Sequence, residues 1–150
     1  QTAKDQTLAN LKSIIRNHSP FHAAQFTPFS QFPQGLPKGM ITGLSSPLGG
    51  GATDFVVNLL KEYPNKRAAW IEPEQTVFPT ALLQKGVGPH QVLFLQTENQ
   101  SLWACHECLR SQLFDFVILN DLDLAEKDLR RLQMNAEKTG TTVLLLSHEP

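Results

Sequence analysis

The stretch "GLPKGMITGLSSPLGGGATDF", residues 35–55, decides the fold. In it a short apolar strand, "MITGL", runs into a glycine-rich loop, and the loop leads into an amphipathic helix. A strand, a glycine-rich loop and a helix in this order are the layout of a site that holds the phosphates of a nucleotide. The stretch therefore predicts the start of a nucleotide-binding type of α/β domain.

The loop lacks the lysine that such a site uses. In the P-loop pattern G-x-x-x-x-G-K-[ST], the lysine neutralises the outer phosphates and the hydroxyl binds magnesium. The eight residues here are "SPLGGGAT", and the loop positions are Ser46, Gly49, Gly50, Gly51, Ala52 and Thr53. Ala52 takes the lysine position, Thr53 keeps the hydroxyl, and a motif started at Gly43 gains no lysine either. Losing one charge-assisted phosphate contact costs about 1.5–3 kcal/mol. We therefore predict a degenerate phosphate cradle without ATP turnover; the alternative is an unrelated glycine-rich turn.

Two further positions bear on nucleotide chemistry. The apolar stretch "FDFVILN" predicts a strand buried on both faces, and it ends in Asn120, where a magnesium-binding carboxylate would stand. Asp121 points to the opposite face of the strand, because side chains alternate. Glu74 follows the strand "RAAWIEP" and is either a general base or a carboxylate at a helix entry. We predict no metal ion, no cofactor and no catalytic residue.

The rest of the chain alternates between strand and helix patterns. Strands are predicted at residues 40–44, 67–73, 91–96, 114–120 and 141–147, and helices at 52–63, 75–86, 99–112 and 122–140. Asp123 and Glu126 form a candidate capping pair for the last helix, and Gly140 a candidate C-cap. Five strands joined by helical crossovers predict a parallel sheet flanked by helices.

The first residues differ in composition. Residues 5–17 have apolar side chains at helical spacing, and the following segment is rich in Phe and Pro. We predict an N-terminal helix and Phe/Pro-rich leader over residues 1–34 and a core over residues 35–150. The phenylalanines must pack on the core or on a partner.

The composition limits the number of domains, the classes of partner and the location to be expected. A chain of 150 residues fits one domain, and a net charge of −1 gives no overall field that attracts nucleic acid. No apolar run reaches the ~20 residues of a membrane span, and no signal segment is present, so a cytoplasmic location is expected. The sequence begins at Gln1 rather than Met, as in a fragment or a trimmed chain.

These segments resemble the RecA recombinase fold. "GLPKGMIT" is similar to the RecA segment that enters the P-loop strand, "AAWIEPE" to the strand with its catalytic glutamate, and "FDFVILND" to its magnesium strand. The resemblance covers residues 35–148 and implies the strand order 3-2-4-5-1, counted along the chain. Where RecA has its first DNA-contacting loop, this chain has the short acidic "DLDLAEK", so direct DNA binding is not expected.

The departures from RecA resemble two families of the bacterial SOS response. "AAWIEPEQTVFPTALLQKGVGPHQVLFLQ", "SLWACHECLRSQLFDFVI" and above all "LRRLQMNAEKTG" are similar to the ImuA proteins and, more distantly, to the SulA division inhibitors. ImuA proteins act through protein contacts with ImuB, an inactive polymerase, in damage-induced mutagenesis. SulA binds the division protein FtsZ and blocks its assembly.

Two short motifs have both a functional and a plain interpretation. "FHAA" gives Phe21 and Ala24 the F-x-x-A spacing by which some recombinases dock one subunit onto the next; chance or packing within the chain is the alternative. "CHEC" places Cys105 and Cys108 on one face of a helix, as half of a zinc site or as core cysteines.

A third feature is a mildly basic face of the last predicted helix, which is either solvated or a partner contact. It consists of Lys127, Arg130, Arg131 and Lys138 and is interrupted by Glu126, Asp128 and Glu137. The resemblance as a whole implies a non-catalytic RecA-like accessory factor of SOS mutagenesis and DNA repair. Its partners would be ImuB, RecA or a second copy. A SulA-like division inhibitor that binds FtsZ and a weak recombinase-type ATPase are the alternatives.

Overall fold

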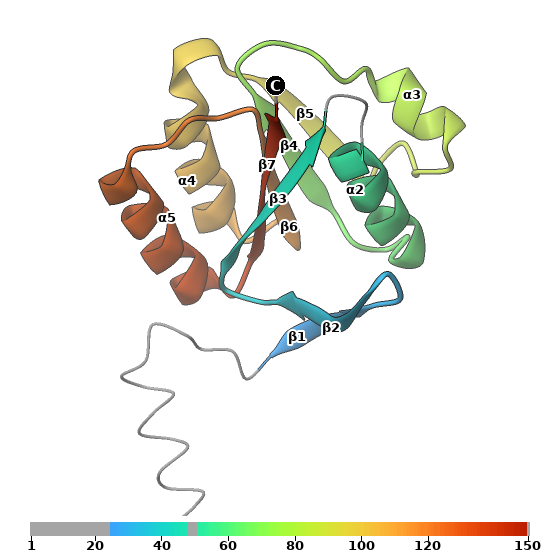
Figure 1. Ribbon diagram of the computed structural model, residues 1–150, viewed down its shortest axis with the longest axis horizontal. Helices are drawn as coiled ribbons and strands as arrows, with labels where there is room; N and C mark the ends of the chain where they lie inside the picture. Colours follow the sequence, from blue (N-terminus) through green and yellow to red (C-terminus); the bar gives the residue numbers. More distant parts are fainter. Residues whose placement is uncertain (1–24, 48–50, 150) are drawn as a thin grey trace, which may run out of the picture.

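The centre of the molecule is a five-stranded parallel sheet. The computed structural model describes residues 25–47 and 51–149. The strands are β3 (Ile41–Pro47), β4 (Ala68–Glu72), β5 (Val92–Gln96), β6 (Phe116–Asn120) and β7 (Thr142–Glu149). They lie in the order β3-β7-β6-β4-β5, and every neighbouring pair is parallel (Figure 1). The predicted fold class and the strand order implied by the RecA resemblance are both confirmed.

Helices cover both faces of the sheet. They are α2 (Gly51–Glu62), α3 (Pro79–Gln84), α4 (Ser101–Ser111) and α5 (Glu126–Thr139), with a short 3-10 helix, η1 (Glu98–Gln100), before α4. In Figure 1, α2 and α3 lie on one side of the sheet, and α4 and α5 on the other. Strand residues alternate between the two cores: Trp70 packs with the α2 side, whereas Ile71 packs with the α4 and α5 side. Every residue of β4 and β6 is buried, as expected for central parallel strands.

The helix ends match the sequence pattern only in part. Gly140 caps α5 in the left-handed conformation at φ 71°, and its N–H donates to the Ala136 carbonyl, which confirms the predicted C-cap. The predicted capping pair is wrong. Helix α5 begins at Glu126 after Ala125, which provides no side-chain cap, so Asp123 lies outside the helix. Helix α3 is shorter than predicted because the chain before Pro79 folds back onto the end of β4.

The described part of the Phe/Pro-rich segment forms an antiparallel hairpin that the sequence pattern did not reveal. Its strands are β1 (Phe26–Phe29) and β2 (Phe32–Pro37). Phe29 is buried and meets Phe55 of α2 edge to face, with 4.9 Å between ring centroids. Tyr63 donates a hydrogen bond to the Pro28 carbonyl. This part of the leader therefore packs on the chain's own core.

Some predictions concern residues that the structure does not describe. The N-terminal helix, Phe21 and Ala24 lie outside the described residues. The predicted division between residues 34 and 35 falls inside β2, and it stays a prediction. Among the described ranges, no helix has the length and hydropathy that crossing a bilayer requires.

Candidate functional site

The candidate site lies at the edge of the sheet where the parallel strands end. In folds of this class, ligands bind at the carboxyl ends of the strands. Ser46 of β3, Glu72 of β4, Asn120 of β6 and His148 of β7 lie at or near the ends of their strands, at the edge marked by the arrowheads in Figure 1.

The described residues of the glycine-rich loop include no positively charged side chain. Helix α2 begins at Gly51, so the strand-loop-helix arrangement is as predicted. Ala52, at the lysine position, is 4% exposed, and its methyl group belongs to the core on the α2 side of the sheet. Ser46 is buried, and its hydroxyl has no hydrogen-bond partner among the described residues. Thr53 is half-buried, while Gly49 and Gly50 lie outside the described residues.

Glu72 is the central group of this edge, and it was missed by the sequence interpretation. It is 3% exposed, although it carries a carboxylate. Oε1 accepts hydrogen bonds from the backbone N–H groups of Thr76 (2.7 Å) and Val77 (3.2 Å). Oε2 accepts from Trp70 Nε1 (3.1 Å), Thr76 Oγ1 (2.9 Å) and Asn120 Nδ2 (2.9 Å). The carboxylate thus links the segment after β4 to β4 itself and to the neighbouring strand β6.

The hydrogen bonds keep the Glu72 carboxyl ionised. Burial alone raises the pKa of this group, because it disfavours the charged form. The hydrogen bonds from Asn120, Thr76, Trp70 and Val77 outweigh burial and hold the pKa below its ordinary value. A buried charge with this many donors is a structural anchor, since its lone pairs are already occupied.

Asn120 is engaged at both ends of its side chain. Its Nδ2 donates to Glu72 and to Thr76 Oγ1 (3.2 Å), so its Oδ1 faces His148 Nε2 at 3.0 Å. With the amide in this orientation, Nε2 of His148 carries the proton and donates it. Asn120 has no free oxygen directed at a metal ion. Asp121, the following residue, is exposed and has φ 60°, so it lies outside the regular strand, and the expectation that it faces away from Asn120 stays a prediction.

Glu74 does not join this group. It is exposed on the segment between β4 and α3. Because α3 begins only at Pro79 and has no acidic residue in its first turn, the interpretation of Glu74 as a helix-entry carboxylate is wrong.

The signal that could have identified Glu72 is its position in "AAWIE": a charged residue inside a run that should be buried on both faces needs partners. In the described ranges, no group of three or more His, Cys, Asp or Glu side chains is arranged to hold a metal ion.

The cysteines of "CHEC" lie in the core. Cys105 and Cys108 are free and buried on the sheet-facing side of α4. Burial, and for Cys105 also the neighbouring Cys108 thiol, raises the Cys105 pKa. Burial and Glu107 raise the pKa of Cys108. Two buried protonated thiols behave as small apolar side chains, which supports the interpretation as core cysteines.

Comparison with known proteins shows which known fold the chain shares. No protein-family model matches the chain, and no curated protein matches its sequence. The structure is similar to the crystal structure of SulA from Pseudomonas aeruginosa, with a TM-score of 0.62 and 20% sequence identity. The match covers 73% of this chain and 98% of that one. At this identity the likeness concerns the fold alone: the chain has the RecA-like α/β fold that SulA also has.

Proposed function

We propose that this protein is a non-catalytic RecA-like accessory factor that acts by protein contacts in SOS-induced translesion mutagenesis and DNA repair. Its proposed partners are ImuB, RecA or a second copy of the chain. The observation that carries the proposal is the replacement of two groups that nucleotide chemistry needs at the carboxyl edge of the sheet. There a buried methyl group stands at the position of the phosphate-binding cation, and an amide locked between two side chains stands at the position of the metal-binding carboxylate.

The energetics of this edge argue against nucleotide turnover. A magnesium ion bound at Asn120 would have to break its contact with His148 or with the ionised Glu72, and hydrogen bonds to charged groups contribute about 1.5–3 kcal/mol each. A side chain as long as lysine at position 52 would displace the packing of α2 on the sheet. Thr53 keeps its hydroxyl and Glu74 is exposed, but the described residues of the loop offer no cationic side chain that could hold the phosphates of a nucleotide.

The choice of the ImuA type rests on the sequence segments and on the fold together. The most diagnostic segment, "LRRLQMNAEKTG", forms most of α5, whose outer surface is polar and charged. Because a fold by itself does not determine a function, the proposal depends on these segments and on the substituted positions of the site rather than on the fold alone.

Two measurements test the proposal. Titration calorimetry with ATP and magnesium is expected to show no binding at millimolar nucleotide. Pull-down from purified components is expected to retain ImuB or RecA. Phosphate release that stays with the protein through purification and disappears in Thr53→Ala or Glu74→Gln would establish the ATPase alternative instead.

A SulA-like division inhibitor is the second candidate, and the structural likeness to SulA favours it. The two proposals differ in partner. Retention of FtsZ without ImuB or RecA, together with inhibition of FtsZ assembly, would select this alternative.

A further inference from the structure

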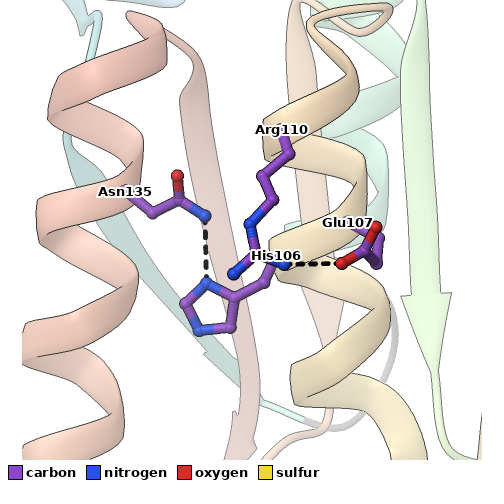
Figure 2. Close-up of polar contacts among 4 residues, drawn as sticks. All are labelled: His106, Glu107, Arg110 and Asn135. Atoms are coloured by element: carbon purple, nitrogen blue, oxygen red, sulfur yellow. Dashed lines mark hydrogen bonds and ion pairs between the residues drawn. The ribbon is translucent and has the colours of Figure 1, made fainter.

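A groove of about 370 Å³ runs between α4 and α5, on the side of the sheet opposite α2. Its lining residues are His106, Arg110, Arg131, Met134, Asn135 and Lys138, and we refer to it as the α4/α5 groove. Figure 2 shows His106 of α4 and Asn135 of α5 pointing toward each other, with 3.0 Å between Nδ1 and Nδ2. This contact joins the two helices across the groove.

The groove offers mainly hydrogen-bond donors. Burial, and after it Arg110 and Arg131, lower the pKa of His106, while Asp128 and Glu107 act in the opposite direction. At neutral pH the imidazole is therefore uncharged, and with Nδ1 accepting from Asn135 its proton lies on Nε2. The same groove therefore contains the N–H of His106, the guanidinium groups of Arg110 and Arg131, and the ammonium group of Lys138.

Two of these cations have no carboxylate partner. Among the described residues, Arg131 and Lys138 form no ion pair, whereas Arg130 on the same helix pairs with Glu126 at 2.6 Å. Arg110 is paired with Glu107 at 2.5 Å (Figure 2), and this exposed bridge contributes little to stability. The charge on Arg131 and Lys138 is thus available to an external anion.

Large apolar side chains are exposed on the same two helices. Met134, in the groove, is 59% exposed, and Trp103, seven residues before Arg110 on α4, is 62% exposed. Residues seven apart lie on the same face of a helix, so Trp103 and Arg110 share the outer face of α4. Exposed Trp, Met and Arg side chains are the types enriched at protein interfaces.

We propose that the α4/α5 groove docks an acidic peptide segment of a protein partner, with aliphatic side chains of that segment packing on Met134. The inference rests on the proposed function, because it assigns the surface through which the protein contacts act. Charge complementarity selects an acidic occupant. A long nucleic acid fits less well, because the chain has a net charge of −1 and therefore no overall field that attracts a polyanion.

The test uses a short fluorescein-labelled peptide rich in Asp and Glu with interspersed leucines. Fluorescence anisotropy is recorded for the wild-type chain and for the double variant Arg131→Glu/Lys138→Glu. The matched control is Lys61→Glu/Arg67→Glu, which changes the charge equally at exposed residues outside the groove. Thermal unfolding of each variant verifies that it is folded.

The expected result is a loss of peptide affinity of at least about tenfold in the groove variant, and a change of less than about threefold in the control. Met134→Gln is expected to weaken binding by a smaller factor, and a peptide with Asn and Gln in place of Asp and Glu should not bind. Absence of wild-type binding at millimolar peptide, equal losses in both double variants, or binding of single-stranded DNA in place of the peptide would overturn the inference.

A parallel pull-down with ImuB and RecA separates this inference from the proposed function. If the wild-type chain and the groove variant both retain a partner, the groove is not the docking surface, but the function stands. If the wild-type chain retains neither partner, the proposed function fails, and the peptide titration still decides whether the groove binds acidic segments.

Discussion

The side-chain amide of Asn120 donates a hydrogen bond to the carboxylate of Glu72 across two neighbouring strands, with 2.9 Å between Nδ2 and Oε2. Both side chains are buried at the carboxyl edge of the sheet. The pair links the ends of β4 and β6 by a buried contact, and several consequences of this contact and of the surrounding packing can be measured.

Replacing Glu72 with Gln should lower the free energy of unfolding by about 2–4 kcal/mol. The substitution replaces one carboxylate oxygen with an NH₂ group, so the buried donors that bonded to that oxygen lose their acceptor. Urea unfolding followed by far-UV circular dichroism measures the loss. Glu74→Gln is the matched control, and its exposed position predicts a change within about 0.5 kcal/mol. Equal effects of the two substitutions would show that the Glu72 contacts are not stabilising.

The same carboxyl predicts a loss of stability in acid. Since the pKa of Glu72 is lower in the folded chain than its ordinary value of 4.5, its contribution is fully present above that value. The contribution disappears as the pH falls through the folded-state pKa. The urea midpoint of the wild-type chain should therefore fall more steeply below about pH 4.5 than that of Glu72→Gln. Parallel curves for the two proteins would contradict the assignment.

Removing Arg131 should raise the pKa of His106, because a positive charge that disfavours the imidazolium is lost. Two-dimensional NMR of the imidazole signals of Arg131→Ala against pH measures the shift. Arg130→Ala is the control, since Arg130 pairs with Glu126 and is not among the groups that shift His106. A shift of the same size in the control would mean that His106 responds only to overall charge.

The buried thiols should resist modification in the native chain. Burial raises the pKa values of Cys105 and Cys108, so little thiolate forms near neutral pH. Reaction with a chromogenic disulfide reagent is expected to be slow in buffer and fast in urea, with Cys105 slower than Cys108. Immediate reaction of both thiols in buffer would show that α4 readily separates from the sheet or packs on it in a different orientation.

Phe29→Ala should destabilise the protein by about 3–4 kcal/mol, because it removes a buried ring that meets Phe55 and anchors the hairpin to α2. Phe26→Ala, at an exposed position of the same hairpin, should cost less than about 1 kcal/mol. The comparison is made by thermal and urea unfolding. Similar costs at both positions would mean that the hairpin does not pack on the core as described.

The regular core could be predicted from the sequence because its signals are local. "FDFVILN" and "RAAWIEP" are largely apolar runs, and such runs predict central parallel strands. Gly140 marks a helix end because only a residue that tolerates positive φ fits there. The strand order came from the resemblance to RecA, since no local pattern determines which strands pair.

What the sequence did not reveal depends on contacts between distant residues. Glu72 is linked to another strand through Asn120, which is 48 residues away along the chain, and the sequence interpretation chose Glu74 because it follows the strand. The hairpin was missed because its prolines and glycines obscure the strand pattern, while its stability comes from Phe29 and Leu36 packing on a core formed later in the chain. The capping pair failed because Asp123 has capping chemistry, but the chain turns into the helix only at Glu126.

The strand order also constrains how the chain can be assembled during synthesis. β7 is synthesised after the other four strands of this sheet, yet it is an interior strand, bonded to β3 on one side and to β6 on the other. Until it inserts, Ile41 and its neighbours in β3 have no strand to pair with, because their partners begin at Val143. The sheet therefore cannot grow outward from its first strand, and a nascent chain released before residue 143 would carry two bare strand edges exposed to aggregation.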